Sequence, residues 1–323
     1  MRITLSFPPQ NVSDILMIAA ACGIIAIIFI YRGYTIKAHN KLKRRNRFLT
    51  AITTKLRITQ RDVTADLKTA RQIQLGLLPT QIPDVKRMRI DLTYRPFSEV
   101  SGDIYDFFHF DDNKLGIFIG DASGHGFAPA LIGTLSKMSL YHHSRSAKSA
   151  SELIRAINLD LTANIHSNNY MTCFWGVFDF EQNKLTYSRA GHPVQLVLRK
   201  DGTLCNLRAE GTLIGLLEDA VFEQEEFNFQ NGDRFFLFTD GIYDTIPKNS
   251  GERNNVMNYN QFAQLVKKTH SKPFDMTLAA IKESLSGFKH EDDYTLIIAE
   301  ICDRDSLSTV RTESGAGQAL LSP

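Results

Sequence analysis

The segment LGIFIGDASGHGFAPAL, residues 115–131, combines an apolar run, a glycine-rich turn and the start of a second apolar run. The first run, Leu115–Gly120, is short and apolar and predicts a buried β-strand. Asp121 follows directly, although strands disfavour Asp, and the glycines beside it permit tight turns and close approach of a ligand. The run Ala128–His142 predicts a helix. An acidic residue at the tip of a buried strand is unusual, although one such residue alone more often belongs to a turn or cap.

Acidic residues stand in comparable positions at three further points in the chain. These are Ser101–Asp106 (SGDIYD), Thr239–Gly241 (TDG) after the strand-like run Arg234–Phe238, and Glu291–Asp293 (EDD) before the run Thr295–Ile301. One Asp-Gly pair alone usually indicates a turn. Four such segments together favour a shared site, where unpaired carboxylates would be costly to bury. A hard divalent cation would compensate, because Mg²⁺ and Mn²⁺ prefer oxygen ligands, and two such ions can activate a water for attack on a phosphoryl group.

The rest of the region from Arg89 onwards contains strand-like and helix-like runs that do not alternate strictly. The further strand-like runs are Arg89–Tyr94, Thr172–Asp179, Lys184–Arg189, Gln195–Arg199 and Phe222–Phe229, and the further helix-like runs are Ser151–Asn164, Tyr259–His270 and Phe274–Ser286. This pattern predicts an α+β layered domain and disfavours a doubly wound parallel sheet. Residues 303–323 are polar and predict a disordered tail.

Seven blocks, in this order, resemble the SpoIIE/RsbU-type branch of the PPM metal-dependent Ser/Thr protein phosphatases, relatives of the type 2C enzymes. The blocks are ARQIQLGLLP (70–79), VSGDIYDFF (100–108), GDASGHGFAPAL (120–131), AGHP (190–193), GTLIGL (211–216), DRFFLFTDGIYD (233–244) and EDDYTLIIAE (291–300). The resemblance covers about Ala65 to Ile301. It implies an αββα sandwich with two metal ions, Mn²⁺ or Mg²⁺, in a cleft at one end of the sheets. It also implies that a bridging hydroxide attacks phosphoserine or phosphothreonine without a phosphoenzyme.

The resemblance also implies roles for individual residues. Asp121 would bridge the two ions, and Asp103 would bind the second ion together with the backbone carbonyl of Ala122. Asp240 and Asp292 would bind the first ion, with Asp293 as the alternative to its neighbour in the doublet. Other assignments stay open: Asp244 could touch a further ion, and Arg95 is either a phosphate clamp or an exposed strand-end arginine. His125 and His192 both stand in glycine-flanked turns and are expected to structure their loops, and for His125 the alternative is a proton donor to the leaving group.

The N-terminal part of the chain carries an uncharged apolar run, Ile15–Tyr31, of a length that can cross a bilayer. Seven basic residues follow it: Arg32, Lys37, Lys41, Lys43, Arg44, Arg45 and Arg47. Their position argues against a cleaved signal peptide and, by the positive-inside rule, places the C-terminal side in the cytoplasm. We therefore expect a single-pass anchor in the inner (cytoplasmic) membrane with an outside tail of residues 1–14. The alternative is a buried core helix.

The residues after this run predict a long helix, because no proline occurs between Tyr34 and Leu78. Apolar residues recur every seven positions: Leu42, Leu49, Leu56, Val63, Ala70 and Leu77. The companion positions are partly polar, so a weak homodimeric coiled coil and an amphipathic helix packed on its own domain are equally compatible with the pattern. We expect a basic linker over 32–64 and a phosphatase domain over 65–302. The segment 62–78 resembles the regulatory switch helix of the family, with Ile73, Gln74, Leu77 and Leu78 as its contact residues.

Composition and resemblance together favour a membrane-anchored protein phosphatase. The chain has 323 residues and a formal net charge of +2, but the part after Arg47 is mildly acidic, which argues against a nucleic-acid surface. The four scattered cysteines indicate reduced thiols and neither a disulfide framework nor a zinc site. By resemblance the substrate is a phosphorylated STAS-type anti-sigma factor antagonist in partner-switching signalling. The alternatives are a catalytically silent phosphoprotein-binding module and a nucleotide cyclase, and the complete carboxylate set and the lack of a convincing phosphate-binding loop disfavour them.

Overall fold

The computed structural model describes residues 10–303 with the exception of 125, 166–168 and 249–256. The chain divides into two compact units, residues 1–65 and 66–323. Of the predicted tails, residues 1–9 and 304–323 lie outside the described residues, whereas residues 10–14 form the start of α1. The second unit contains the strands and all helices except most of α1, which runs from Gln10 to Leu77.

Two antiparallel sheets form the centre of the second unit. In the order of their strands, the first sheet contains β1 (Met88–Arg95), β12 (Tyr294–Ile301), β9 (Arg234–Phe238), β6 (Gln195–Leu198) and β7 (Leu204–Leu207). The second contains β2 (Asp103–Asp111), β3 (Lys114–Ala122), β4 (Met171–Asp179), β5 (Lys184–Ala190) and β8 (Gln224–Asn228). A separate ribbon pairs β10 (Thr245–Pro247) with β11 (Phe288–His290).

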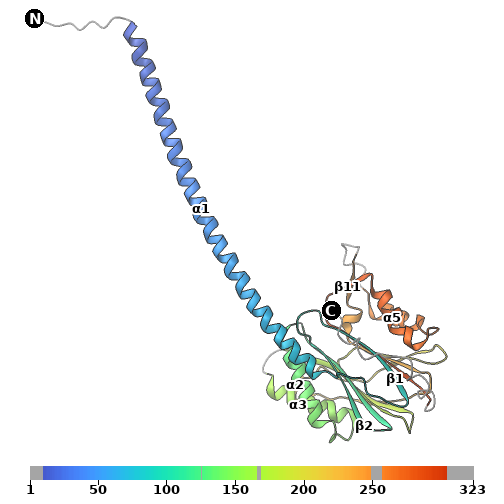
Figure 1. Ribbon diagram of the computed structural model, residues 1–323. Coiled ribbons are helices and arrows are strands. Elements are labelled where there is room, and N and C mark those ends of the chain that lie inside the picture. The colour runs from blue at the N-terminus through green and yellow to red at the C-terminus, as the bar shows by residue number, and fades with distance from the viewer. Residues whose placement is uncertain (1–9, 125, 166–168, 249–256, 304–323) are drawn as a thin grey trace, which may run out of the picture. The chain divides into compact units, whose positions relative to one another are not determined.

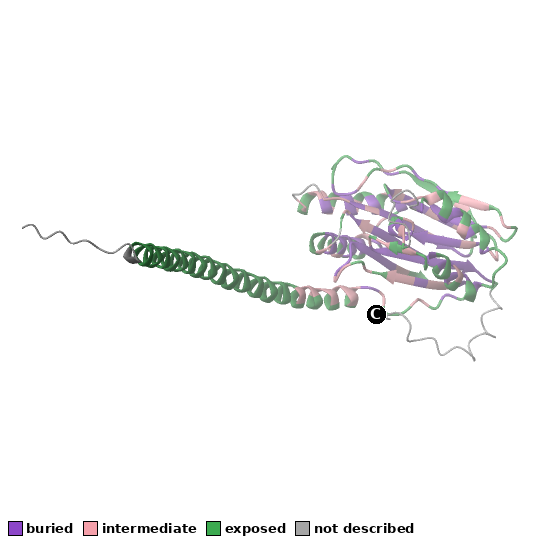
Figure 2. Cartoon of the chain, turned by 90° about the horizontal axis from the view of Figure 1, so that it is seen from above, coloured by how far each residue is buried: buried purple, intermediate pink, exposed green. Residues whose placement is uncertain are grey.

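Helices cover the outer face of each sheet. The helices α2 (Phe127–His143) and α3 (Ala150–Asn164) lie against strands of the second sheet, and α4 (Tyr259–Lys268) and α5 (Phe274–Leu285) against strands of the first. Figure 2 shows the buried strands of the sheets between their more exposed helices. The predicted αββα sandwich is therefore confirmed, and each predicted strand and helix corresponds to an observed one. The strands β2, β7, β10 and β11 were not predicted as strands.

Aromatic side chains fill the space between the sheets. Phe178 of β4 lies edge-on to Phe235 of β9, with ring centroids 4.9 Å apart, and both are fully buried. A second apolar cluster lies between the first sheet and its helices, where Phe238 contacts Phe262 of α4 at 4.8 Å. Both sheets are thus buried on both faces over much of their area. The eight residues of β12 are all buried, as expected for a central strand.

The helix α1 is continuous to Leu77 and stops before Pro79, as proline requires. Every described side chain from Val12 to Val63 is exposed, including the apolar run Ile15–Tyr31. In the second unit one face of the helix becomes partly buried, and Leu75 and Leu78 pack against the main core. The interpretation of the apolar run as a core helix is not supported by burial within this chain.

Candidate active site

Asp103 and Asp121 lie directly opposite each other in the antiparallel pair β2–β3. Asp103 is the first residue of β2 and Asp121 is the penultimate residue of β3, so both stand at the same end of the sheet. Asp121 is also opposite Thr172 of β4. The pairing therefore brings together two carboxylates that the sequence separates by a strand, a turn and a second strand.

The carboxylate of Asp103 is held between the two sheets and is only 1% exposed. Its Oδ2 accepts hydrogen bonds from the hydroxyl groups of Thr239 (2.8 Å) and Thr295 (2.6 Å). These threonines follow β9 and lie within β12, so they belong to the other sheet. The Oδ1 atom of Asp103 is buried and has no hydrogen-bond partner among the described residues. One oxygen is thus fixed by protein donors while the other is available to a ligand.

The position of Asp240 is set by Gly241, which lies against the backbone of Asp293, the residue immediately before β12. Asp240 begins a short 3₁₀ turn, Asp240–Ile242, directly after Thr239. A methyl group added at Gly241 would overlap the backbone carbonyl oxygen of Asp293, so only glycine fits at this contact. The TDG segment therefore contacts the EDD segment, and the acidic residues after β9 and before β12 lie at the same end of the first sheet.

The Asp292–Asp293 doublet has two different environments. Asp293 is 2% exposed and accepts hydrogen bonds from the backbone N–H groups of Phe97 on Oδ1 (2.6 Å) and of Gly102 on Oδ2 (2.7 Å). Asp292 is less buried, and its Oδ1 accepts from the N–H of Asp293 at 2.8 Å. Asp293 therefore links the start of β12 to residues 97–102, the segment that directly precedes Asp103.

Electrostatic repulsion links these carboxyl groups. Burial raises the pKa of Asp121, and Asp103, Asp240, Asp292 and Asp293 raise it further. Burial also raises the pKa of Asp103 against the lowering effect of the Thr295 hydroxyl, and Asp293 and Asp240 add to the rise. The pKa of Asp240 is raised by burial and by Asp244. In a site of this kind the carboxylates require either protons or cations to offset their charge.

The donor set fits hard divalent cations. It consists of carboxylate oxygens and the backbone carbonyl oxygen of Ala122. This carbonyl lies close to Gly102, where an added methyl group would come within 2.7 Å of the oxygen. Among the described residues no three acidic, histidine or cysteine side chains are close enough to form a ready-made metal cluster. The carboxylates lie at the same end of the sheets but farther apart than metal ligands around one ion. This is compatible with a site in which they move closer together when cations bind.

The end of α1 is attached to the same region. The side-chain Nε2 of Gln74 donates to the carbonyl oxygen of Ser101 (2.7 Å), and the N–H of Ser101 donates to the Oε1 of Gln74 (3.0 Å). Of the other switch-helix residues, Leu78 is buried and Leu77 half-buried, whereas Ile73 is 65% exposed. Only part of the predicted contact set therefore touches the domain.

Several remaining candidates lie at the rim or in supporting positions. Arg95 is exposed at the end of β1, and His125 lies outside the described residues. His192 is buried, its Nδ1 lies 2.9 Å from the Thr172 hydroxyl, and burial and Arg189 lower its pKa to about 3, so the imidazole is neutral. The threonines at 172, 239 and 295 were not predicted. Thr239 stands beside Asp240 and Thr295 two residues after Asp293, which is their only signal in the sequence, whereas Thr172 is far from every expected ligand along the chain.

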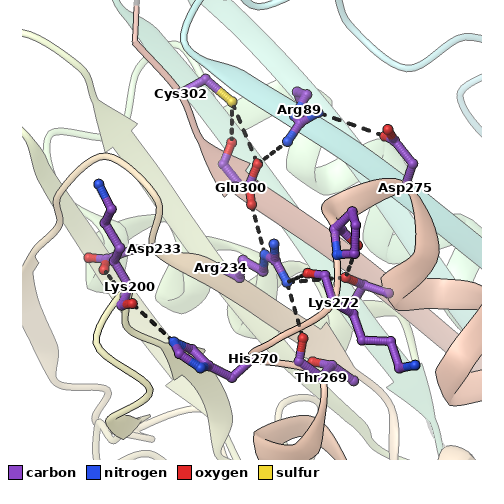
Figure 3. Close-up of polar contacts among 12 residues, drawn as sticks. Arg89, Lys200, Asp233, Arg234, Thr269, His270, Lys272, Asp275, Glu300 and Cys302 are labelled. Atoms are coloured by element: carbon purple, nitrogen blue, oxygen red, sulfur yellow. Dashed lines mark hydrogen bonds and ion pairs between the residues drawn. The ribbon is translucent and has the colours of Figure 1, made fainter.

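A cavity of about 220 Å³ lies at the opposite end of the first sheet. It is lined by Leu198, Arg199, Lys200, Gly232, Arg234, His270 and Glu300. Figure 3 shows that Glu300 bonds to both Arg89 and Arg234, and that His270 contacts the backbone of Lys200. This end joins the first sheet to α4 and α5 and holds none of the converging carboxylates.

Comparisons with known proteins show the family and the fold to which this chain is similar. Residues 111–301 match the family model described as Stage II sporulation protein E (SpoIIE). The phosphoserine phosphatase RsbU of Bacillus subtilis (strain 168) is 25% identical over 247 residues, which cover 75% of this chain and 72% of RsbU. The phosphoserine phosphatase RsbP of the same organism is 32% identical over 184 residues, covering 55% of this chain and 45% of RsbP. The SiaA-PP2C domain of Pseudomonas aeruginosa superposes with a TM-score of 0.65 at 20% identity, over 76% of this chain and 99% of that domain, and shows the same fold.

Proposed function

Because the chain belongs to the SpoIIE family and carries a PPM-type protein phosphatase domain, we propose that it hydrolyses phosphoserine or phosphothreonine in a protein, using two divalent cations, Mn²⁺ or Mg²⁺. The observation that carries this proposal is the convergence of Asp103, Asp121 and Asp240, from three distant segments, at one end of the two sheets. RsbU and RsbP, which are named as phosphoserine phosphatases, support the substrate chemistry.

The cations would be held by the residues that the family resemblance implies. Asp121 would contact both ions, Asp103 and the Ala122 carbonyl the second ion, and Asp240 and Asp292 the first. Asp292 is favoured over Asp293, because both oxygens of Asp293 already accept backbone hydrogen bonds. When bound, the cations would supply Lewis-acid chemistry that activates water and offsets the charge of the phosphoryl group.

The remaining residues of the site position this carboxylate set. The two threonine hydroxyls fix one oxygen of Asp103, while the other is buried and has no hydrogen-bond partner among the described residues. Asp293 accepts hydrogen bonds from both ends of the 97–102 segment and so holds this segment next to the first residues of β2. Gly241 lets the turn that begins at Asp240 lie against the backbone of Asp293. These contacts keep the charged groups in fixed places, which lowers the reorganisation needed during the reaction.

The substrate that the resemblance indicates is a phosphorylated STAS-type anti-sigma factor antagonist. Removal of its phosphate would let the antagonist capture its kinase and anti-sigma partner, as in partner switching. The cited RsbU and RsbP similarities support this assignment at the level of the family.

We place regulation in α1. The Gln74–Ser101 hydrogen bonds link the segment 62–78 to the residues directly before Asp103, so a movement of the helix would be felt at the site. Leu42, Leu49 and Leu56 are exposed along the linker, which supports a homodimeric coiled coil as the source of such a movement.

The N-terminal part of α1 would anchor the protein in the cytoplasmic membrane as a single-pass helix, with the phosphatase domain in the cytoplasm. Within the described part of the chain, α1 is the one helix long and apolar enough to cross a bilayer, and the window that qualifies is unburied. The basic residues that follow Tyr31 support the orientation.

The test is hydrolysis of a generic phosphate ester by the detergent-solubilised full chain with added Mn²⁺. We expect metal-dependent activity in the wild type and its loss in Asp121→Asn and in Asp240→Asn. Asp112→Asn, at an exposed turn residue, is the matched control and should retain activity. A wild-type protein that binds Mn²⁺ but hydrolyses neither the ester nor a phosphorylated STAS-type protein would support the phosphoprotein-binding module instead.

A further inference from the structure

A buried ion pair joins α2 to β2. The Nζ of Lys137 lies 2.6 Å from the Oδ2 of Asp106, and the two side chains are only 5% and 4% exposed. Neither of these atoms has a hydrogen-bond partner elsewhere among the described residues. The second oxygen of Asp106 accepts a hydrogen bond from the Phe107 N–H (2.8 Å), and Tyr141 lies beside both charged groups. Among the described residues each charge is nevertheless paired only with the other, and a buried pair of this kind adds little to stability while strongly disfavouring arrangements that separate it.

The pair lies in a regular seam between the helix and the strand. Pro129 lies against Gly102 and Gly133 against Ile104, close enough that a methyl group on either glycine would contact its neighbour. Two turns further along, the Tyr141 ring lies over Phe108, with centroids 5.0 Å apart. Four helix residues thus match two strand residues at each step, because a helical turn and a strand dipeptide have similar lengths.

Within this seam Asp106–Lys137 is the contact that distinguishes one register from the next. A shift of α2 by one turn would place Lys137 over Ile104 or Phe108 and would leave both charges buried without an oppositely charged partner. The other seam contacts are apolar or involve glycine, and they discriminate less strongly between registers. The ion pair therefore selects the observed position of α2 along β2.

The position of α2 matters because its first turn follows the candidate ligands. Asp121 and Ala122 end β3, and α2 begins at Phe127. The N–H of Ala122 donates to the carbonyl oxygen of Gly102 at 3.2 Å, beside Asp103. A displaced helix would move the segment that connects it to Ala122. Figure 1 shows α2 beside β2.

We propose that Asp106 and Lys137 are positioning residues that fix the register of α2 on β2 and thereby hold Asp121 and Ala122 opposite Asp103. Neither residue touches the reacting groups. The expected effect of these residues on Mn²⁺ binding rests on the proposed function.

The decisive variant replaces both charges with neutral groups of similar size, Asp106→Asn with Lys137→Met, in the full chain. It leaves no unpaired buried charge, so folding is expected, whereas Lys137→Met alone would strand Asp106. The control is Arg199→Met with Asp233→Asn, which removes a 2.6 Å ion pair at the opposite end of the first sheet. Circular dichroism, hydrogen exchange and calorimetric titration with Mn²⁺ are measured for all three proteins.

We expect the neutral double variant to exchange the backbone amide hydrogens of Ala122 and of residues 130–133 at least tenfold faster than the control, and to bind Mn²⁺ at least tenfold more weakly. Exchange and affinity both within twofold of the control would overturn the proposal. If the wild type does not bind Mn²⁺, the metal assignment fails and exchange alone decides. If the double variant does not fold, Asp106→Glu keeps the charge but lengthens the side chain, and unchanged exchange in that variant would equally overturn the proposal.

Discussion

The side-chain amide of Gln74 forms with Ser101 the same two hydrogen bonds that a neighbouring β-strand would form. Its Nε2 donates to the Ser101 carbonyl oxygen and its Oε1 accepts from the Ser101 N–H. A helix side chain thereby completes the backbone hydrogen bonding of the residue two positions before Asp103. The orientation of the loop before Asp103 is consequently coupled to the position of the C-terminal end of α1.

Gln74→Ala should weaken activation by Mn²⁺ without unfolding the domain. Two hydrogen bonds of about 1 kcal/mol each correspond to roughly a tenfold to thirtyfold rise in the Mn²⁺ concentration for half-maximal activity. Gln72→Ala, at an exposed position two residues earlier, is the matched control. Equal Mn²⁺ curves for the two variants would show that the Ser101 contact has no part in the site.

Thr295→Val should destabilise the metal-free protein and reduce its affinity for Mn²⁺, because it removes a hydroxyl donor to a buried carboxylate. Loss of such a charge-assisted bond costs about 1.5–3 kcal/mol of unfolding free energy. Urea unfolding and calorimetry provide the measurements. Thr295→Ser keeps the hydroxyl and should restore Mn²⁺ affinity, and a serine variant as weak as the valine variant would instead implicate packing of the methyl group.

Gly241→Ala should be among the most damaging small substitutions in the domain. The added methyl group meets the backbone carbonyl of Asp293, so the Asp240 turn must move away from β12. We expect a loss of about 1–3 kcal/mol in unfolding free energy together with a loss of activity. At Gly287 an added methyl group meets nothing within 4 Å, so Gly287→Ala should leave both quantities nearly unchanged.

The metal-free protein should lose stability as the pH rises above the ordinary Asp range. The pKa values of Asp103 and Asp121 are raised by burial, so between the unfolded pKa of 3.8 and the higher folded values the folded state holds more protons than the unfolded state. The unfolding free energy then falls with increasing pH. Urea unfolding in EDTA should show this fall in the wild type and a smaller one in Asp121→Asn. Saturating Mn²⁺ should remove the fall in the wild type, because bound cations take the place of the protons. Identical slopes in EDTA would contradict the raised pKa of Asp121.

The full chain should resist alkaline extraction from membranes. Ile24→Asp with Ile27→Asp places two acidic residues in the apolar run and raises the insertion cost by about 6 kcal/mol, so this variant should become extractable. Ile24→Leu with Ile27→Leu is the control. Release of the wild type by carbonate would exclude a spanning anchor.

The sequence was sufficient for the elements with a strong local pattern. The apolar runs behind β3, β9 and β12 and the four helices that cover the sheets were all predicted, because burial dictates their composition. The strand β2 was not, since its first residues, DIYD, serve the site and the ion pair and so depart from a strand-like composition. Local patterns predict cores well and functional strands poorly.

Other details depended on contacts between distant segments. Nothing local distinguishes Asp292 from Asp293, and their different environments follow from where Phe97 and Gly102 lie. The roles of Thr239 and Thr295 likewise require both sheets to be docked around Asp103. Ile73 was expected in the helix contact set, but the helix turns a neighbouring face, with Gln74 and Leu78, to the domain.

The place of β12 has a consequence for synthesis on the ribosome. It is the last strand of the described part of the chain, yet it lies between β1, the first described strand, and β9. Until its residues leave the exit tunnel, a nascent chain exposes two unpaired strand edges that could pair with other chains. Asp292 also arrives only at this stage, directly ahead of the strand. A polypeptide interrupted before Asp292 would therefore lack both an interior strand of its first sheet and one residue of the proposed carboxylate set, so any phosphatase activity would be confined to chains that extend through β12.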